Sequence, residues 1–100
     1  MKKNIMYDLF KKLHHIALKN KTIGIDINLP EVTSSIEFKY HNYNYDNNTK
    51  VIELVSLEDD TVFTIDTDKI QNITKYEELE GLRYNLQFGS WDANVWLLEY

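Results

Sequence analysis

Apolar and polar residues alternate in short segments over most of this chain, and this period limits the possible folds more than any other feature. Successive side chains of a β-strand point to opposite faces, so the alternation predicts strands with one buried face. The clearest case is the segment 82–88, where Leu82, Tyr84, Leu86 and Phe88 are separated by polar residues. The sequence therefore predicts a protein built mainly from strands.

Turn residues separate these segments. Pro30 follows one of them and cannot donate to a strand ladder, while Gly89-Ser90 is typical of a tight hairpin turn with glycine first. In the last segment apolar residues occupy both faces, which predicts a central or doubly covered strand. The expected antiparallel strands span about residues 22–29, 34–43, 50–57, 61–67, 82–88 and 91–99.

We expect the stretch 51–65 to lie at the centre of the fold. β-branched and aromatic residues flank the polar break at 58–60, and this order predicts a strand, a turn and a second strand. Phe63 and Ile65 share one face of the second strand. We expect this hairpin to form the middle of a single antiparallel sheet.

Two places leave the pattern ambiguous. Tyr43 and Tyr45 have the opposite parity to Tyr40, so either a bulge lies near Asn42 or these tyrosines face outward. The segment 66–81 fits either a continued strand or an irregular crossing. For that segment we favour the crossing, with one short helical turn capped by Asp68, closed by Gly81.

One amphipathic helix precedes the strands. Met6, Leu9, Leu13 and Ile16 recur at helical spacing, and Asn4 is a plausible N-cap, which predicts a helix over about residues 5–19. No helical pattern recurs between strands, so parallel βαβ units are not expected. The predicted class is α+β, with the helix packed on a curved antiparallel sheet of about five to six strands. A small SH3-like or Sm-like barrel with an N-terminal helix is the alternative.

Composition narrows the functional classes. A length of 100 residues predicts one domain, and the absence of cysteine removes disulfides and thiolate chemistry. A reducing, cytoplasmic setting is therefore expected. Asp8, Lys11 and Lys12 interrupt any apolar signal segment, and no apolar run is long enough to cross a bilayer. We expect no contact with a membrane.

Catalytic and metal-binding patterns are weak. His14 and His15 are adjacent on the predicted helix and diverge by about 100°, so they cannot bind one metal from the same face. The acidic residues do not match the spacing of a calcium-binding loop, and three glycines leave no phosphate-binding loop. The sequence predicts neither an enzyme nor a bound metal or cofactor.

Charge is distributed unevenly along the chain. Residues 1–21 hold six lysines against Asp8, a net +5, whereas residues 22–100 hold 5 basic and 15 acidic residues, a net −10. An acidic body favours encounter with a positively charged partner and disfavours binding to nucleic acid. Aspartate is also common in turns for backbone reasons, so the same residues fit a solvated loop.

These observations favour a protein-binding module. We expect a small acidic domain that inhibits or regulates a larger protein, such as a nuclease, by occupying a basic surface. Phage-encoded inhibitors and immunity proteins share this size and charge, although the analogy rests on composition alone. The candidate contacts are the acidic residues and two tyrosines outside the strand phase: Glu58, Asp59, Asp60, Asp66, Asp68, Tyr43 and Tyr45. Reversing the charge of Asp59 and Asp60 to lysine should weaken partner binding.

Two other functions remain open. A small barrel could bind nucleic acid through Lys11, Lys12, Lys19 and exposed aromatic residues, and salt-dependent binding in a gel shift would favour it. The chain could also be a structural or accessory protein that forms a homodimer through its last strand.

Overall fold

The computed structural model describes residues 2–19, 22–56 and 61–98, which form one α-helix, a short 3-10 helix and eight strands. The predicted α+β class with antiparallel strands is confirmed. The elements in order are α1 (Lys2–Lys19), β1 (Thr22–Asn28), β2 (Thr33–Lys39), β3 (Asn42–Asp46), β4 (Val51–Val55), β5 (Val62–Asp66), η1 (Thr67–Lys69), β6 (Asn72–Glu78), β7 (Gly81–Gln87) and β8 (Asp92–Leu98).

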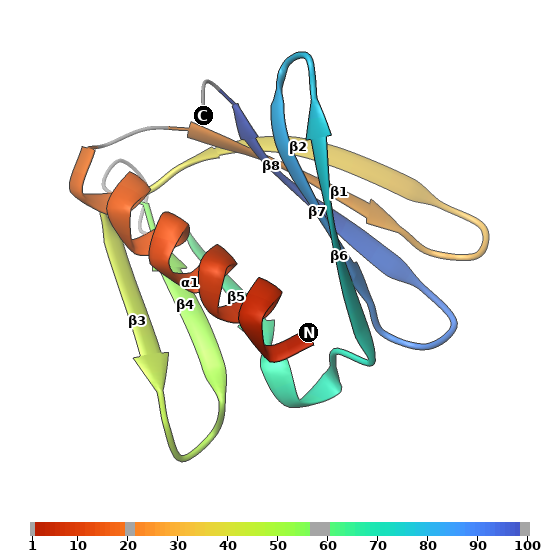
Figure 1. Cartoon of the computed structure of the whole chain (residues 1–100), viewed down its shortest axis with the longest axis horizontal. Coiled ribbons are helices and arrows are strands. Elements are labelled where there is room, and N and C mark those ends of the chain that lie inside the picture. Colours follow the sequence, from red (N-terminus) through yellow and green to blue (C-terminus); the bar gives the residue numbers. More distant parts are fainter. Residues whose placement is uncertain (1, 20–21, 57–60, 99–100) are drawn as a thin grey trace.

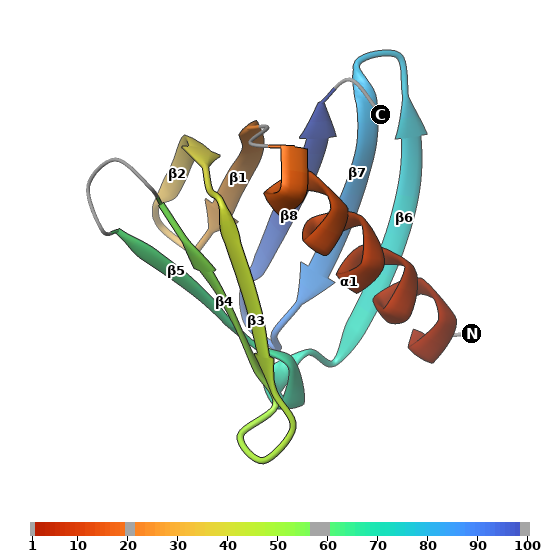
Figure 2. The same ribbon diagram turned by 90° about the vertical axis from the view of Figure 1, so that its left-hand side faces the viewer.

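The strands form two sheets and not the single sheet that was expected. The large sheet has the order β2-β1-β8-β7-β6 and the small sheet has the order β3-β4-β5. Figure 2 shows the two sheets facing each other at an angle, with α1 between them. The division into an open five-stranded and a three-stranded sheet also differs from the small barrel considered as an alternative.

The large sheet is organised around β8, which lies between β1 and β7 as the predicted central strand. Its inner residues Ala93, Val95 and Leu97 are buried. The turn at Gly89-Ser90 joins β7 to β8, with Gly89 at a φ of 104° and the Phe88 N–H donating to the Trp91 carbonyl at 3.0 Å. Glycine adopts this conformation without the steric cost that other residues incur.

The hairpin of β4 and β5 lies in the small sheet and not at the centre of the fold. Ile52 is paired with Ile65, and both side chains are buried against the rest of the core. β4 is nevertheless the middle strand of its own sheet, flanked by β3 and β5. The hairpin pattern was therefore interpreted correctly, while its place in the whole molecule was not.

The change of parity after Tyr40 has a simple cause. The expected strand 34–43 runs across the end of β2 and the start of β3, but the chain leaves the large sheet after Lys39 and enters the small sheet at Asn42. Tyr40 at this crossing is buried, and its hydroxyl donates to the Leu13 carbonyl of α1 at 2.8 Å. Because each sheet has its own inner face, the inward parity is set anew at the crossing.

β6 is a full strand where an irregular crossing was predicted. It pairs with β7 through seven residues, with Ile73 opposite Leu86. Its other inward positions are Lys75 and Glu77, so apolar alternation is missing from the sequence. The expected helical turn does occur, as η1, but Asp66 caps it and not Asp68.

α1 fills the space between the sheets on the side of β3 and β6 (Figure 1). Leu9, Leu13 and Ile16 are buried, as the helical spacing predicted. The helix begins at Lys2, so Asn4 lies inside its first turn and is not the N-cap.

Candidate functional site

The acidic residues predicted as contacts do not form one described cluster. Glu58, Asp59 and Asp60 lie outside the described residues. Asp66 is half-buried at the start of η1, where its carboxylate accepts the backbone N–H of Asp68 at 3.2 Å. Asp68 is exposed on the same short helix. The Asp66 carboxylate therefore has a local backbone role as the cap of η1.

Tyr43 and Tyr45 point toward α1 and are half-buried. The Tyr43 ring stacks on His14 with centroids 5.3 Å apart, and the Tyr45 ring lies 5.5 Å from that of Phe10. Burial, together with the nearby Tyr45, raises the pKa of the Tyr43 hydroxyl. These contacts with α1 differ from the exposure expected of interface anchors.

The lysines considered for nucleic-acid binding differ in their exposure and contacts. Lys11 and Lys19 are exposed, whereas the Lys12 ammonium contacts the Asp8 carboxylate of α1 at 2.5 Å. Asp8 also accepts hydrogen bonds from the Tyr84 hydroxyl at 2.5 Å and the Lys75 ammonium at 3.2 Å. Burial raises the pKa of the Asp8 carboxyl, but these three donors outweigh it and hold the pKa well below its usual range.

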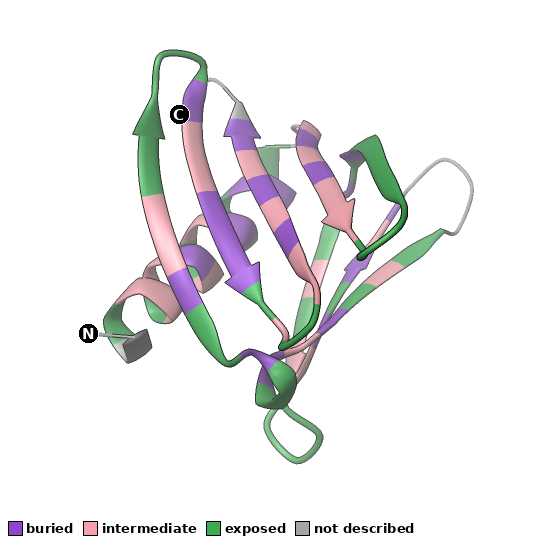
Figure 3. Ribbon diagram, turned by 90° about the vertical axis from the view of Figure 1, so that its right-hand side faces the viewer, coloured by how far each residue is buried: buried purple, intermediate pink, exposed green. Residues whose placement is uncertain are grey.

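The side of the large sheet turned away from α1 offers a more extensive polar surface. Figure 3 shows this side, and no other described element lies over it. We call it the outer face. Three complete rows of its residues run across the strands from β2 to β6: Glu37, Gly24, Trp96, Arg83 and Tyr76; then Ser35, Asp26, Asn94, Asn85 and Thr74; then Thr33, Asn28, Asp92, Gln87 and Asn72.

A tryptophan, an arginine and a tyrosine stand side by side in the first row. Arg83 is directly opposite Trp96 on one side and Tyr76 on the other. The guanidinium carbon of Arg83 lies 4.1 Å from the Tyr76 ring centroid and 5.4 Å from that of Trp96. Such cation–π contacts contribute about 0.5–1 kcal/mol each at exposed sites. They hold three large side chains in one ordered row.

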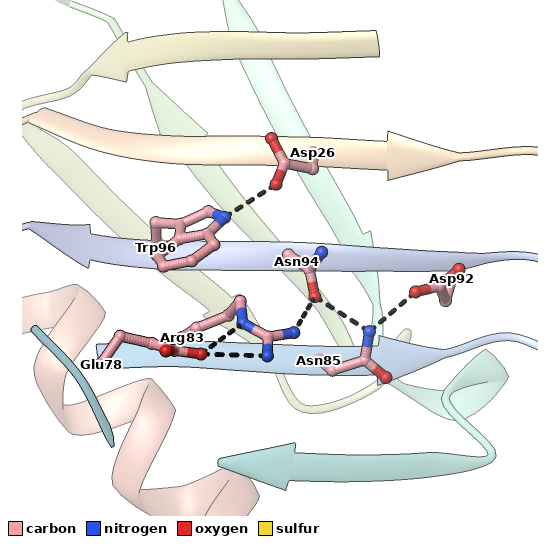
Figure 4. A network of polar contacts seen from close by, with 7 residues as sticks. All are labelled: Asp26, Glu78, Arg83, Asn85, Asp92, Asn94 and Trp96. Carbon is pink, nitrogen blue, oxygen red and sulfur yellow. Dashed lines mark hydrogen bonds and ion pairs between the residues drawn. The ribbon is translucent and has the colours of Figure 1, made fainter. Parts of the chain in front are cut away.

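Hydrogen bonds fix the guanidinium further. Both Nε and Nη2 of Arg83 donate to Glu78 Oε1, at 3.2 and 3.1 Å, and Nη1 donates to Asn94 Oδ1 at 3.3 Å (Figure 4). The Arg83–Glu78 ion pair is partly exposed, so its contribution to stability is small. Its main effect is to restrict the rotamers of Arg83.

Trp96 is held by the neighbouring strand β1. Its indole N–H donates to Asp26 Oδ2 at 2.7 Å, and the other oxygen of Asp26 accepts from the Ser35 hydroxyl at 2.8 Å. Gly24 faces Trp96 across the strand pair, and a Cβ at Gly24 would lie 3.3 Å from the Trp96 Cβ. The glycine therefore leaves room for the indole to lie close to the sheet.

Amide and carboxylate groups form the other two rows. The Asn85 amide donates to Asp92 Oδ2 at 2.7 Å and to Asn94 Oδ1 at 2.9 Å, while the Gln87 amide donates to Asn85 Oδ1 at 3.0 Å. Asn85 is buried at the centre of these contacts, whereas the exposed Gln87 has hydrogen-bonding capacity left at the surface. The three rows hold three carboxylates and one guanidinium. Glu78 and Lys39 lie on the same side of β6 and β2, which makes four carboxylates against two cationic side chains, so the outer face is negatively charged.

The sequence contained part of this information. A two-residue turn at Gly89-Ser90 places Arg83 opposite Trp96, because positions equidistant from the turn pair in a hairpin. The predicted pair of segments on either side of that turn therefore implied the contact. Tyr76 could not be added, since its strand was not predicted.

Comparisons with known proteins give no identification: no family model, curated protein or solved structure matches this chain. Among the described residues, no helix combines the length and the apolar character needed to cross a membrane. In the same residues, no three histidine, aspartate or glutamate side chains gather as a metal site would require. The outer face is thus assessed on its own chemistry.

Proposed function

We propose that this protein is a protein-binding module that uses the outer face to occupy a basic surface of a larger protein, as an inhibitor or regulator does. The observation that carries the proposal is the row of Trp96, Arg83 and Tyr76. Tryptophan, tyrosine and arginine are the residues that most often dominate the energy of protein interfaces. Here they lie together on a sheet face that no described element covers.

Preorganisation supports the proposal. Side chains that must be immobilised on binding reduce affinity by about 0.5–1.5 kcal/mol each. Arg83 and Trp96 are already held by Glu78, Asn94 and Asp26, so a partner would find them close to their bound geometry. Tyr76 is 42% exposed at the edge of the row, which leaves its ring accessible.

The charge of the surface suggests the partner's chemistry. A carboxylate lies in each row of the outer face, Glu37 in the first, Asp26 in the second and Asp92 in the third, and the third row also holds the amides of Asn28, Asn72 and Gln87. A partner with arginine or lysine side chains complements this surface. The attraction should fall as salt is added, because exposed charges are screened beyond about 10 Å at 0.1 M ionic strength.

Affinity capture with paired variants tests the proposal. The full chain is used as bait in a lysate of its native host, beside the double variant Arg83→Ala/Tyr76→Ala. Loss of two anchors should weaken capture of any specific partner by about 2 kcal/mol or more, roughly thirtyfold. The matched control is Val62→Ala/Glu53→Ala, which removes an apolar and a charged side chain from the exposed side of the small sheet.

Three outcomes contradict the proposal. Equal capture by the wild type and the Arg83→Ala/Tyr76→Ala variant would exclude the outer face, and loss with the Val62→Ala/Glu53→Ala control alone would assign binding to the small sheet. A wild-type chain that is dimeric by light scattering and becomes monomeric with the Arg83→Ala/Tyr76→Ala variant would assign the outer face to self-association. Circular dichroism of each variant confirms that it is folded before capture is compared.

A further inference from the structure

A pocket of about 270 Å³ lies between β5 and the inner face of the large sheet. Ile27, Leu86, Ala93 and Val95 of β1, β7 and β8 form its floor, and β5 forms the facing wall. This position is apart from the outer face, because these side chains point to the opposite side of the same strands. Figure 2 shows β5 at the margin of the small sheet that is farther from α1.

Aromatic side chains line the rest of the pocket. Phe63 of β5 contributes from the facing wall. Phe88 and Trp91 stack at the end of the β7–β8 hairpin, with ring centroids 4.4 Å apart and planes 10° from parallel. Both rings are partly exposed, so they border the opening. An apolar ligand in this pocket would contact aliphatic side chains on one side and aromatic side chains on the other.

The volume limits the size of an occupant. Engineered apolar cavities of about 150 Å³ stay dry and bind benzene. A pocket of about 270 Å³ suits a ligand roughly twice the size of benzene, such as an acyl chain of about ten carbons. Transfer of such a chain from water is favourable by about 0.8 kcal/mol for each buried CH₂ group.

Two charged residues line the pocket, Lys69 and Asp66. Lys69 is exposed at the end of η1, and among the described residues it has no ion-pair partner. Asp66 instead caps η1 by accepting the Asp68 N–H, so part of its acceptor capacity is used. The ammonium of Lys69 is therefore the group available for a ligand of opposite charge.

We propose that this pocket binds a medium-chain monocarboxylate, with the acyl chain between β5 and the large sheet and the carboxylate at Lys69. The binding is non-covalent and does not depend on the outer face. It gives the protein a small-molecule site in addition to its proposed protein-binding surface.

Titration calorimetry with three ten-carbon probes tests the chemistry. Decanoate, decanol and decylamine share the chain length and differ in the charge of the head group. Decanoate should bind most tightly and decylamine least, with decanoate roughly fivefold tighter than decanol because the ammonium lies at an exposed rim. In Lys69→Gln this advantage should disappear, while the exposed control Lys39→Gln should retain it.

A substitution in the floor tests the location. Ala93→Leu places three extra carbons in the pocket and should weaken decanoate binding roughly tenfold or more. Thr33→Leu, which adds the same side chain to an exposed position on β2, is the matched control and should bind decanoate as the wild type does.

The proposal is overturned if none of the probes shows saturable binding to the wild-type chain. It also fails if decylamine binds better than decanoate, which would assign the head group to Asp66. Unchanged binding in a folded Ala93→Leu protein would place the site elsewhere. The readout is independent of any protein partner, so its failure is distinguishable from failure of the outer-face interaction.

Discussion

The space between the two sheets is occupied differently on its two sides. On the side of β3 and β6, the closed half, α1 inserts Leu9, Leu13 and Ile16 into the core. On the side of β5, the open half, the same inner face of the large sheet borders the 270 Å³ pocket. Both halves share the inner face of the large sheet, so the contrast arises mainly from where the single described α-helix lies.

In the closed half, polar contacts also join α1 to the strands. Asp8 receives hydrogen bonds from Tyr84, Lys75 and Lys12, and the Tyr40 hydroxyl reaches the Leu13 carbonyl. Directional bonds of this kind fix the position of the helix in a way that apolar packing alone does not. The open half is bordered mainly by apolar side chains. The closed half is thus packed and hydrogen-bonded in a way that stabilises the fold, whereas the open half leaves apolar surface available.

The largest effect should follow from truncation in the closed half. Leu13 is fully buried, and Leu13→Ala should lower the free energy of unfolding by about 3 kcal/mol through lost burial and the cavity left behind. Urea denaturation followed by circular dichroism measures this value. The counterpart in the open half is Ile27→Ala, which should cost about 1 kcal/mol because Ile27 is half-buried beside existing free space. Equal costs would remove the distinction between the halves.

Sequence reasoning predicted the local structure of both halves better than their arrangement. The hairpin of β7 and β8 follows from the alternation at Leu82, Tyr84 and Leu86 and from the Gly89-Ser90 turn. The separation into two sheets does not follow, because the break at Tyr40 changes parity in the same way as a bulge. The long-range pairing decides between these interpretations, because β2 pairs with β1 whereas β3 pairs with β4.

The missed strand has a physical reason as well. β6 presents Lys75 inward because the Asp8 carboxylate is there to receive it, and this partner is 67 residues away in sequence. An ion pair across the core side thus replaced the apolar residue that the period required. The same omission hid the outer face, since Tyr76 completes its row only once β6 pairs with β7. The pocket could not be foreseen, because it depends on the angle between the sheets.

The Asp8 cluster should make the stability of the closed half dependent on pH. The folded pKa of Asp8 lies below its ordinary value of 3.8, so the stabilisation is complete above about pH 4 and is lost as the pH falls below it. Near neutral pH, Asp8→Asn should be less stable than the wild type by about 1 kcal/mol, a value reduced by partial exposure of the carboxylate. The difference between the unfolding free energies of the two proteins should be constant near neutral pH and should narrow as the pH falls from about 4 to 2.5.

The control for this prediction is Glu53→Gln, which removes an exposed carboxylate from the small sheet. Its difference from the wild type should stay small across the same pH range. A constant gap between Asp8→Asn and the wild type down to pH 2.5 would show that the contribution of Asp8 does not depend on its charge.

The smallest effect should come from adding volume to the open half. Ala93→Leu extends into the pocket, so the free energy of unfolding should change by less than about 1 kcal/mol. The matched substitution in the closed half is Ala17→Leu, at a helix position only 5% exposed, where extra carbons should cost about 1–3 kcal/mol. Leucine and alanine are both good helix formers, so intrinsic propensity adds little to the cost of Ala17→Leu. Chemical denaturation of the two variants compares free volume on the two sides of the same core. If Ala93→Leu were the more damaging substitution, the open half would be as tightly packed as the closed half, and neither the contrast nor a ligand pocket could be maintained.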